Sequence, residues 1–227
     1  MASTSNQSDL SAFPSVTQLY ASGECKPSKS STKLSHSPRL NSRVHLTCGD
    51  MTKLKVDAIV NAANKSLMGG GGVDGAIWLA AGHTWLLGEC GKLGGCDPGR
   101  AKMTGGGQLP ATHIIHAVGP VYQPAKKAEC AELLRSCYRT CMEIAHGAGL
   151  QTIAFRGIST GAFQYPKVEA ARIALAEVKR FLESSVDMKP EVLFCTYSAE
   201  DEALYRREIS SIYPDESAGI TIAPGSG

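Results

Sequence analysis

The sequence lacks several patterns that would reveal a function directly. It contains no CxxC or HxxxH pair and no GxxxxGK[ST] stretch, which argues against a zinc site built from these motifs and against a nucleoside-triphosphate P-loop. It has no long uninterrupted apolar run and no apolar signal-peptide segment after Met1. The net charge of +2 is too small to indicate nucleic-acid binding, and no basic cluster is combined with an aromatic platform. The sequence thus predicts neither a membrane protein nor a specific nucleic-acid binder.

What is present suits one globular domain with tails. At 227 residues, 43% of them apolar, the chain is long enough to bury a substantial core. We expect residues 1–42 to form a disordered, serine-rich leader, residues 43–213 the domain, and residues 214–227 a flexible tail. An organellar transit peptide is the alternative for the leader, although arginine is absent before Arg39 and no amphipathic helix is evident. We expect an intracellular protein, cytoplasmic or nuclear, with organellar targeting left open.

The eight cysteines fall inside expected secondary structure. Cys48 and Cys195 lie in expected strands, and Cys130, Cys137 and Cys141 follow one expected helix. This distribution is typical of reduced, buried thiols in an intracellular protein and not of a disulfide framework. Cys137 and Cys141, one helical turn apart, could form half of a metal site, but nothing completes it. We therefore expect no metal and no cofactor.

Strand-like and helix-like segments alternate from residue 44 onward. Helical periodicity marks residues 128–146 and the segment after Pro166, and two further helical segments are expected at 77–91 and 199–213. Strands are expected at residues 44–48, 57–62, 101–104, 112–118, 152–155 and 192–197. This alternation predicts a three-layer α/β/α sandwich with a mixed, mostly parallel central sheet. Ligands of such sheets bind at the carboxyl ends of the strands.

A phosphate-bearing ligand is indicated by the stretch that follows the second expected strand. Residues 57–62 are apolar and rich in β-branched side chains, and four glycines at 69–72 precede a helix-like segment. Glycines permit close backbone approach, and the free N–H groups and positive dipole end of a helix favour phosphate. Residues 159–162, Ser-Thr-Gly-Ala, form a second loop of small residues. Two such loops facing each other could hold a diphosphate from both sides.

A dinucleotide-binding Rossmann site is a weaker interpretation. Residues 70–75 match GxGxxG formally. However, the loop between strand and glycines is long, and no acidic residue ends a second strand about twenty residues later to hold a ribose.

Several ordered motifs together resemble the macrodomain family, in its MacroD-type branch of ADP-ribosyl hydrolases. They are Gly49-Asp-Met-Thr52, Val56-Asp-Ala-Ile-Val-Asn-Ala-Ala-Asn64, Gly69-Gly-Gly-Gly-Val-Asp-Gly75 and Gly157-Ile-Ser-Thr-Gly161, with Leu109-Pro-Ala111, His116-Ala-Val-Gly-Pro120 and Phe194-Cys195 in support. The likeness covers about residues 43–213. It implies an ADP-ribose pocket and an enzyme that removes mono-ADP-ribose from acidic side chains of proteins and deacetylates O-acetyl-ADP-ribose.

The resemblance also implies which residues bind. Asp50 would accept from the adenine amino group beside the Met51 backbone, and Tyr197 would stack on adenine. Phe163 would cover the distal ribose. The two loops around the diphosphate and distal ribose are expected to contribute Ala63, Asn64, Gly71, Gly72, Val73 and Asp74 on one side and Ser159, Thr160, Gly161 and Ala162 on the other.

For catalysis we expect Asn64 to orient the distal ribose and Asp74 to position or activate water, with a substrate phosphate able to share the role of base. Nearby phosphate would raise the pKa of Asp74, and the helix dipole would oppose that shift. Each residue also has a structural interpretation: Asp74 as a helix-start acid, Asn64 and Asp50 as turn residues, Tyr197 as a strand aromatic. His113 and His116 alternate on a strand and are assigned no chemistry.

Three small departures from the resemblance affect loop shape. Gly107 stands where relatives usually have tyrosine, and Ala162 and Gln164 also differ from the usual residues of the second loop. They make the preferred protein substrate uncertain but do not change the expected class of reaction.

The alternative function is a non-catalytic ADP-ribose reader. We expect ADP-ribose, mono-ADP-ribosylated proteins and O-acetyl-ADP-ribose as partners of a monomer, with no membrane and no specific nucleic acid.

Overall fold

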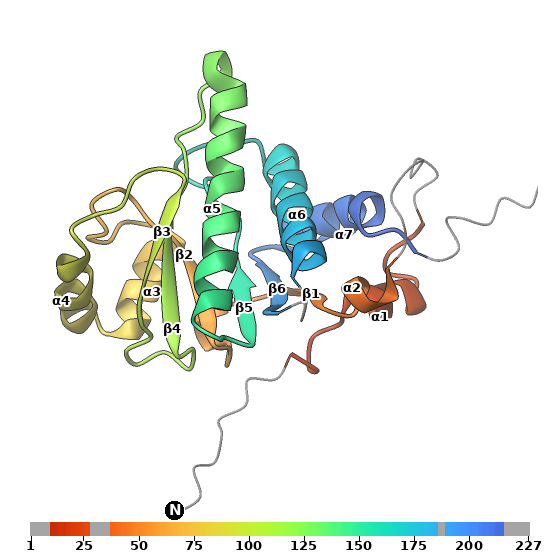
Figure 1. Ribbon diagram of the computed structural model, residues 1–227, viewed down its shortest axis with the longest axis horizontal. Coiled ribbons are helices and arrows are strands. Elements are labelled where there is room, and N and C mark those ends of the chain that lie inside the picture. Colours follow the sequence, from red (N-terminus) through yellow and green to blue (C-terminus); the bar gives the residue numbers. More distant parts are fainter. Residues whose placement is uncertain (1–9, 28–36, 186–188, 216–227) are drawn as a thin grey trace, which may run out of the picture.

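Six strands form one mixed sheet in the computed structural model, which describes residues 10–27, 37–185 and 189–215. The strand order is β1-β6-β5-β2-β4-β3 (Figure 1). All neighbours are parallel except β3, which pairs antiparallel with β4 at the edge. The strands are β1 (Val44–Cys48), β2 (Ala58–Ala62), β3 (Arg100–Gly105), β4 (His113–Val118), β5 (Thr152–Phe155) and β6 (Glu191–Thr196). Every expected strand is present, within two residues at either end.

Helices cover both faces of the sheet, which confirms the three-layer sandwich (Figure 1). Because successive strand side chains point to opposite faces, Val60 of β2 packs with one helical layer and Ile59 with the other. The first layer contains α5 (Lys127–Gly147), α6 (Lys167–Ser184) and α7 (Ala199–Ile212). The second contains α3 (Val73–Ala81) and α4 (His83–Leu93), and two short 3₁₀ turns, η1 (Met51–Lys53) and η2 (Pro124–Lys126), lie in the connections.

The structure differs from the expected disorder of residues 1–42 wherever it describes that segment. Helix α1 (Val16–Ala21) begins with a capping box: Ser15 Oγ accepts from the Gln18 amide at 3.3 Å, and Gln18 Oε1 accepts from the Ser15 amide at 2.8 Å. Leu10 and Leu19 are buried. A second helix, α2 (Pro38–Asn41), follows, whereas residues 1–9, 28–36 and 216–227 lie outside the described residues. The serine-rich composition led to the expectation of disorder, because α1 is too short to show a clear apolar periodicity in the sequence.

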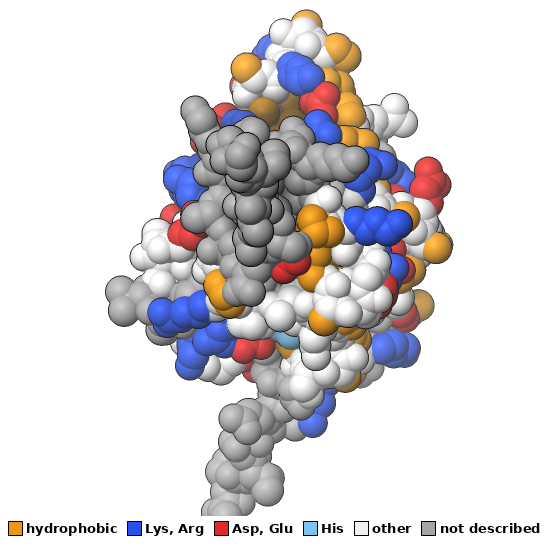
Figure 2. Space-filling model, turned by 90° about the vertical axis from the view of Figure 1, so that its right-hand side faces the viewer, with side chains coloured by type: hydrophobic (Ala, Val, Ile, Leu, Met, Phe, Trp, Pro, Cys, Tyr) orange, Lys and Arg blue, Asp and Glu red, His pale blue; other side chains and the backbone are white. Residues whose placement is uncertain are grey.

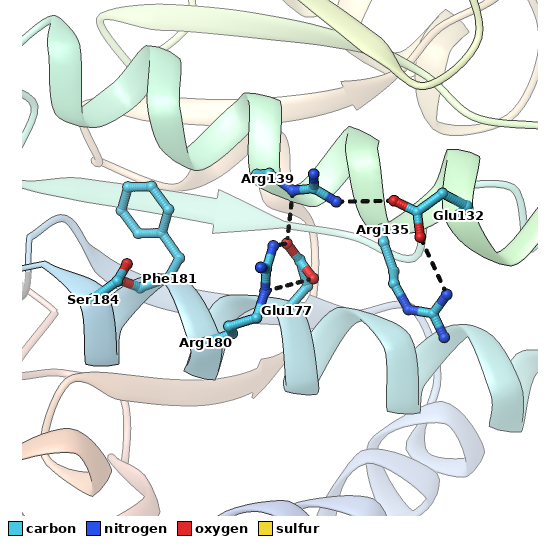
Figure 3. A network of polar contacts seen from close by, with 7 residues as sticks. All are labelled: Glu132, Arg135, Arg139, Glu177, Arg180, Phe181 and Ser184. Atoms are coloured by element: carbon cyan, nitrogen blue, oxygen red, sulfur yellow. Dashed lines mark hydrogen bonds and ion pairs between the residues drawn. The ribbon is translucent and has the colours of Figure 1, made fainter.

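Helices α5 and α6 are joined by a network of charged side chains (Figure 3). The buried Glu177 carboxylate on α6 accepts from Arg139 Nε of α5 at 3.0 Å and from Arg180 Nε at 3.2 Å. Arg139 also donates to Glu132 at 3.1 Å. The buried carboxylate is therefore neutralised by two guanidinium groups, the condition under which a buried charge is tolerated.

The described surface carries both signs of charge. On the side shown in Figure 2, lysine and arginine side chains are interspersed with aspartate and glutamate. Among the described residues, no helix is both long and apolar enough to cross a bilayer.

Replacing Leu19 tests whether α1 belongs to the core. We expect Leu19→Ala to lower the free energy of unfolding by about 2–4 kcal/mol, because it removes a fully buried side chain and leaves a cavity. Chemical denaturation measures the loss. The control is Thr17→Ala on the exposed side of the same helix, expected to change stability by about 0.5 kcal/mol or less. Equal stability of the two variants would show that α1 does not pack on the domain.

Candidate functional site

A cleft of about 670 Å³ opens at the carboxyl ends of the parallel strands β1, β5 and β6 and at the start of α3. This volume and position are typical of a small-molecule site in an open α/β sheet. The expected site residues that line the cleft are Asp50, Gly72, Val73, Thr160, Gly161 and Tyr197. Three strands and three helices therefore bring together residues that are far apart in the sequence.

An exposed aromatic ring and a turn acid both line the cleft. The Tyr197 side chain is 77% exposed at the end of β6, so its ring is free to contact a planar ligand. Asp50 Oδ1 accepts from the Thr52 amide at 3.0 Å and the Thr52 hydroxyl at 2.8 Å. These hydrogen bonds hold the pKa of Asp50 below its ordinary value. Asp50 thus stays an acceptor, whereas Met51 does not line the cleft and its side chain lies buried in the core.

Arg156 holds this part of the cleft together and was not identified from the sequence. Its guanidinium donates to the carbonyls of Gly49 at 2.6 Å, Thr196 at 3.2 Å and Cys195 at 3.4 Å. The same group lies 5.2 Å from the centroid of the Tyr197 ring. Arg156 therefore ties the loop after β1 to the end of β6 and supports the aromatic ring.

The glycine loop leads into the first turn of α3. Gly72 is the N-cap residue with φ of 63°, a conformation that favours glycine, so no side chain covers the first N–H groups of the helix. Gly71 and Gly72 are exposed and Val73 is half-buried. The amino end of α3 is thus open toward the cleft, as an anion site requires.

The second loop faces it from the end of β5. Ser159 adopts φ of 64°, a strained conformation for a non-glycine residue, and its buried hydroxyl has no hydrogen-bond partner. A Cβ at Gly119 would lie 2.1 Å from Ser159 Oγ, so this approach depends on a glycine at the end of β4. Ala162 is exposed and Phe163 half-buried beside this loop.

Asn64 and Asp74 lie behind the glycine loop and do not line the cleft. A Cβ at the exposed Gly70 would lie 2.9 Å from Asp74 Oδ2 and 3.6 Å from Asn64 Nδ2, so the two side chains meet beneath that residue. Asn64 braces the loop: Nδ2 donates to the Gly69 carbonyl at 2.8 Å, and Oδ1 accepts from the Ser66 and Leu67 amides. This is the turn role that the sequence left open for Asn64.

Asp74 is only 4% exposed. Its Oδ1 accepts from Asn61 Nδ2 at 2.7 Å. Burial raises the pKa of Asp74 above its ordinary value, and hydrogen bonds from Asn61 and Trp78 act in the opposite direction. Ala63, also expected in the site, is buried and donates its amide to the Ala117 carbonyl at 2.9 Å. Of the expected catalytic residues, Asp74 is therefore shielded and Asn64 is half-buried.

The cleft also extends over residues that the sequence did not single out. Lys167, at the start of α6, donates to Asp201 of α7 at 2.7 Å, and Leu204 and Tyr205 complete this wall. No motif marks these positions, because they are brought to the cleft by helix packing.

The cysteines are free thiols, and Cys48 differs from the rest. Seven are buried as expected, but Cys48 is exposed at the end of β1. Among the described residues, no group of three or more His, Cys, Asp or Glu side chains could hold a metal ion.

Comparison with known proteins identifies the family. The Macro domain family matches residues 60–174. A macro domain-containing protein of Mesorhizobium japonicum is 50% identical over 170 residues, covering 75% of this chain and 95% of that protein. The Xenopus laevis ADP-ribose glycohydrolase MACROD2 is 41% identical over 207 residues, covering 91% of this chain and 49% of its own length, so the chain spans about half of that relative.

A solved structure gives the same answer. The Trypanosoma brucei macrodomain in complex with ADP-ribose superimposes with a TM-score of 0.69 at 36% identity, covering 81% of this chain and 74% of that one. The chain belongs to the macro domain family.

Proposed function

We propose that this chain binds ADP-ribose in the cleft and hydrolyses it from acidic side chains of proteins, and that it also deacetylates O-acetyl-ADP-ribose. One observation carries the proposal: a cleft lined by an exposed aromatic ring, with an open helix N-terminus beside two loops of small residues, and a buried aspartate and a half-buried asparagine beneath the first of them. The relative named ADP-ribose glycohydrolase and the ADP-ribose complex of the T. brucei macrodomain support it.

The elements of the cleft match the parts of the ligand. Adenine stacks on Tyr197 and donates its amino group to Asp50, which remains ionised. The diphosphate lies between the open N–H groups at Gly71–Val73 and the loop of residues 159–162. Phe163 then covers the distal ribose.

The distal ribose comes to rest above Gly70, where Asn64 and Asp74 meet. Hydrolysis breaks the bond between the anomeric carbon and the ester oxygen. Water delivers its hydroxyl to the anomeric carbon and its proton to a base, and the released carboxylate takes the bonding electron pair. Asp74 is suited to orient or deprotonate this water because burial raises the pKa of its carboxyl, and an α-phosphate of the substrate can share the role. Asn64 holds the loop and the ribose hydroxyls without adding charge.

Substitution of Asn64 and Asp74 separates a hydrolase from a reader. We expect Asp74→Asn and Asn64→Ala to lower the turnover number by roughly 10²–10⁴-fold, the range of general-base contributions, while ADP-ribose still binds. The measurement is release of ADP-ribose from a protein mono-ADP-ribosylated on glutamate, with ADP-ribose affinity determined by calorimetry on the same samples.

Asp97→Asn is the control, since Asp97 is exposed and does not line the cleft. Full turnover in both site variants would remove Asn64 and Asp74 from the mechanism. If the wild-type protein binds ADP-ribose but releases none from glutamate-, serine- or arginine-linked substrates or from O-acetyl-ADP-ribose, the reader function holds instead.

The adenine end can be tested by comparing two ligands. We expect Tyr197→Ala to weaken ADP-ribose binding by about 5- to 150-fold, the effect of losing about 1–3 kcal/mol of base stacking. Binding of ribose 5-phosphate, which has no base, should stay the same. Leu87→Ala, an exposed apolar residue on α4, is the matched control. Equal loss for both ligands would place adenine elsewhere.

A further inference from the structure

A chain of buried hydrogen bonds leads from Asp74 across the face of the sheet that α3 and α4 cover to the backbone of β3. Asn61 of β2 contacts Asp74 Oδ1 at 2.7 Å and His116 Nδ1 of β4 at 3.2 Å, both through Nδ2. His116 Nε2 lies 3.0 Å from Thr104 Oγ1, which donates to the Gly105 carbonyl at 3.0 Å. Asn61 and His116 are fully buried. These contacts connect the expected catalytic acid to a histidine that has no other role in the site.

The hydrogen bonds from Asp74 to Gly105 have one donor–acceptor direction. The two protons on Asn61 Nδ2 are both used, one on Asp74 and one on His116 Nδ1, so Nδ1 must be the acceptor and Nε2 must carry the imidazole proton. Nε2 then donates to Thr104 Oγ1, whose own proton goes to the Gly105 carbonyl. Every contact is satisfied when Asp74 is ionised and His116 is neutral.

The amide oxygen of Asn61 shows that this direction is imposed. Oδ1 is buried and has no hydrogen-bond partner. Turning the amide over would place Oδ1 against Asp74 and His116, which requires a proton on the Asp74 carboxyl and a proton on Nδ1. One end of the buried amide is unpaired in either orientation, so its partners at the other end, Asp74 and His116, decide which way it turns.

The other groups near these hydrogen bonds are compatible with an ionised Asp74 and a neutral His116. Burial lowers the pKa of His116 to about 4, which keeps the imidazole neutral near pH 7. The Cys90 thiol of α4 lies 3.7 Å from Nε2, and burial, with the charges of Asp74 and Glu89, raises its pKa to about 11. On the side of α3, Trp78 hydrogen-bonds the Asp74 carboxylate, and Asn64 and Gly70 of the glycine loop are uncharged.

We propose that His116 is a positioning residue for Asp74: acting through Asn61, it fixes the direction of the chain so that Asp74 is presented as an ionised acceptor. This inference rests on the proposed function, in which Asp74 acts on the hydrolytic water. In this arrangement the segment of residues 116–120 provides a neutral acceptor on the face of the sheet covered by α4, as well as the glycine that admits Ser159.

Four variants test the role of the hydrogen-bond chain. His116→Leu removes the acceptor, and His116→Asn restores an amide oxygen near the Nδ1 position. Thr104→Val is close in shape to the native side chain and removes the acceptor for Nε2–H. Cys96→Ala is the matched control, because Cys96 is buried in the same core cluster but its thiol donates to the Asp97 carbonyl, away from the hydrogen-bond chain. Thermal denaturation shows which variants are folded.

We expect His116→Leu and Thr104→Val to raise the titration midpoint of the Asp74 carboxyl by about one pH unit. The midpoint is measured from the ¹³C chemical shift of this carboxyl as a function of pH in the protein without ligand. The acidic limb of the turnover-number profile should shift equally, so that turnover well below the wild-type midpoint falls by about tenfold while KM and ADP-ribose affinity stay within about twofold. His116→Asn should recover most of the turnover, and Cys96→Ala should match the wild-type protein.

The carboxyl titration makes the two proposals separable. An unchanged midpoint in folded Thr104→Val and His116→Leu would overturn the inference whatever the enzyme does. A shifted midpoint in a protein without any turnover would leave the chain in place and overturn the hydrolase function. A fall in ADP-ribose affinity equal to the fall in turnover would also overturn the inference, because it would indicate a general loss of structure.

Discussion

The parallel pairing of β1, β6, β5 and β2 is the constraint on which the site depends. Cys48 pairs with Thr196 and Phe155 with Phe194, so β1, β5 and β6 end at one edge of the sheet. Their following loops must therefore emerge side by side, although the chain returns through a helix between most of them. The cleft contains residues near 50, 72, 156 and 197 for this reason. No single motif could form it alone.

Most of the fold followed from local sequence patterns, because the strands and the large helices have strong periodicity. The helix of residues 128–146, for example, needed only the spacing of Cys130, Leu134, Cys137 and Cys141, and α5 matches it closely. The N-terminal helix α1 could not be predicted from such patterns. Helix α1 has six residues, too few for a periodic signal, and its stability comes from packing against β1 and α2 and from the hydrogen bond of Tyr20 to the Tyr213 carbonyl just after α7.

The site was predictable where chemistry lies in a contiguous motif and hidden where it depends on tertiary geometry. The glycine loop, Asp50 and Tyr197 could be named because their residue types are informative in order along the chain. Arg156 could not, since its role comes from three carbonyls contributed by the ends of β1 and β6. The depth of Asp74 was equally hidden. A sequence shows an acid at a helix start, but only the packing shows that Gly70 covers it.

That depth changes how the acid must work. An exposed carboxylate beside a diphosphate would be ionised but surrounded by water, whereas Asp74 is held among Asn61, Trp78 and Gly70. Burial favours the protonated form, so an ionised Asp74 needs donors fixed in advance. Asn61 can serve as such a donor only if something else dictates how its amide is turned. A neutral His116, anchored by Thr104 to the backbone of β3, meets that need without placing a second charge beneath the phosphates. In a site built for an anionic ligand, a neutral chain of this kind keeps the acid ionised and leaves the positive potential of the α3 N-terminus available to the diphosphate.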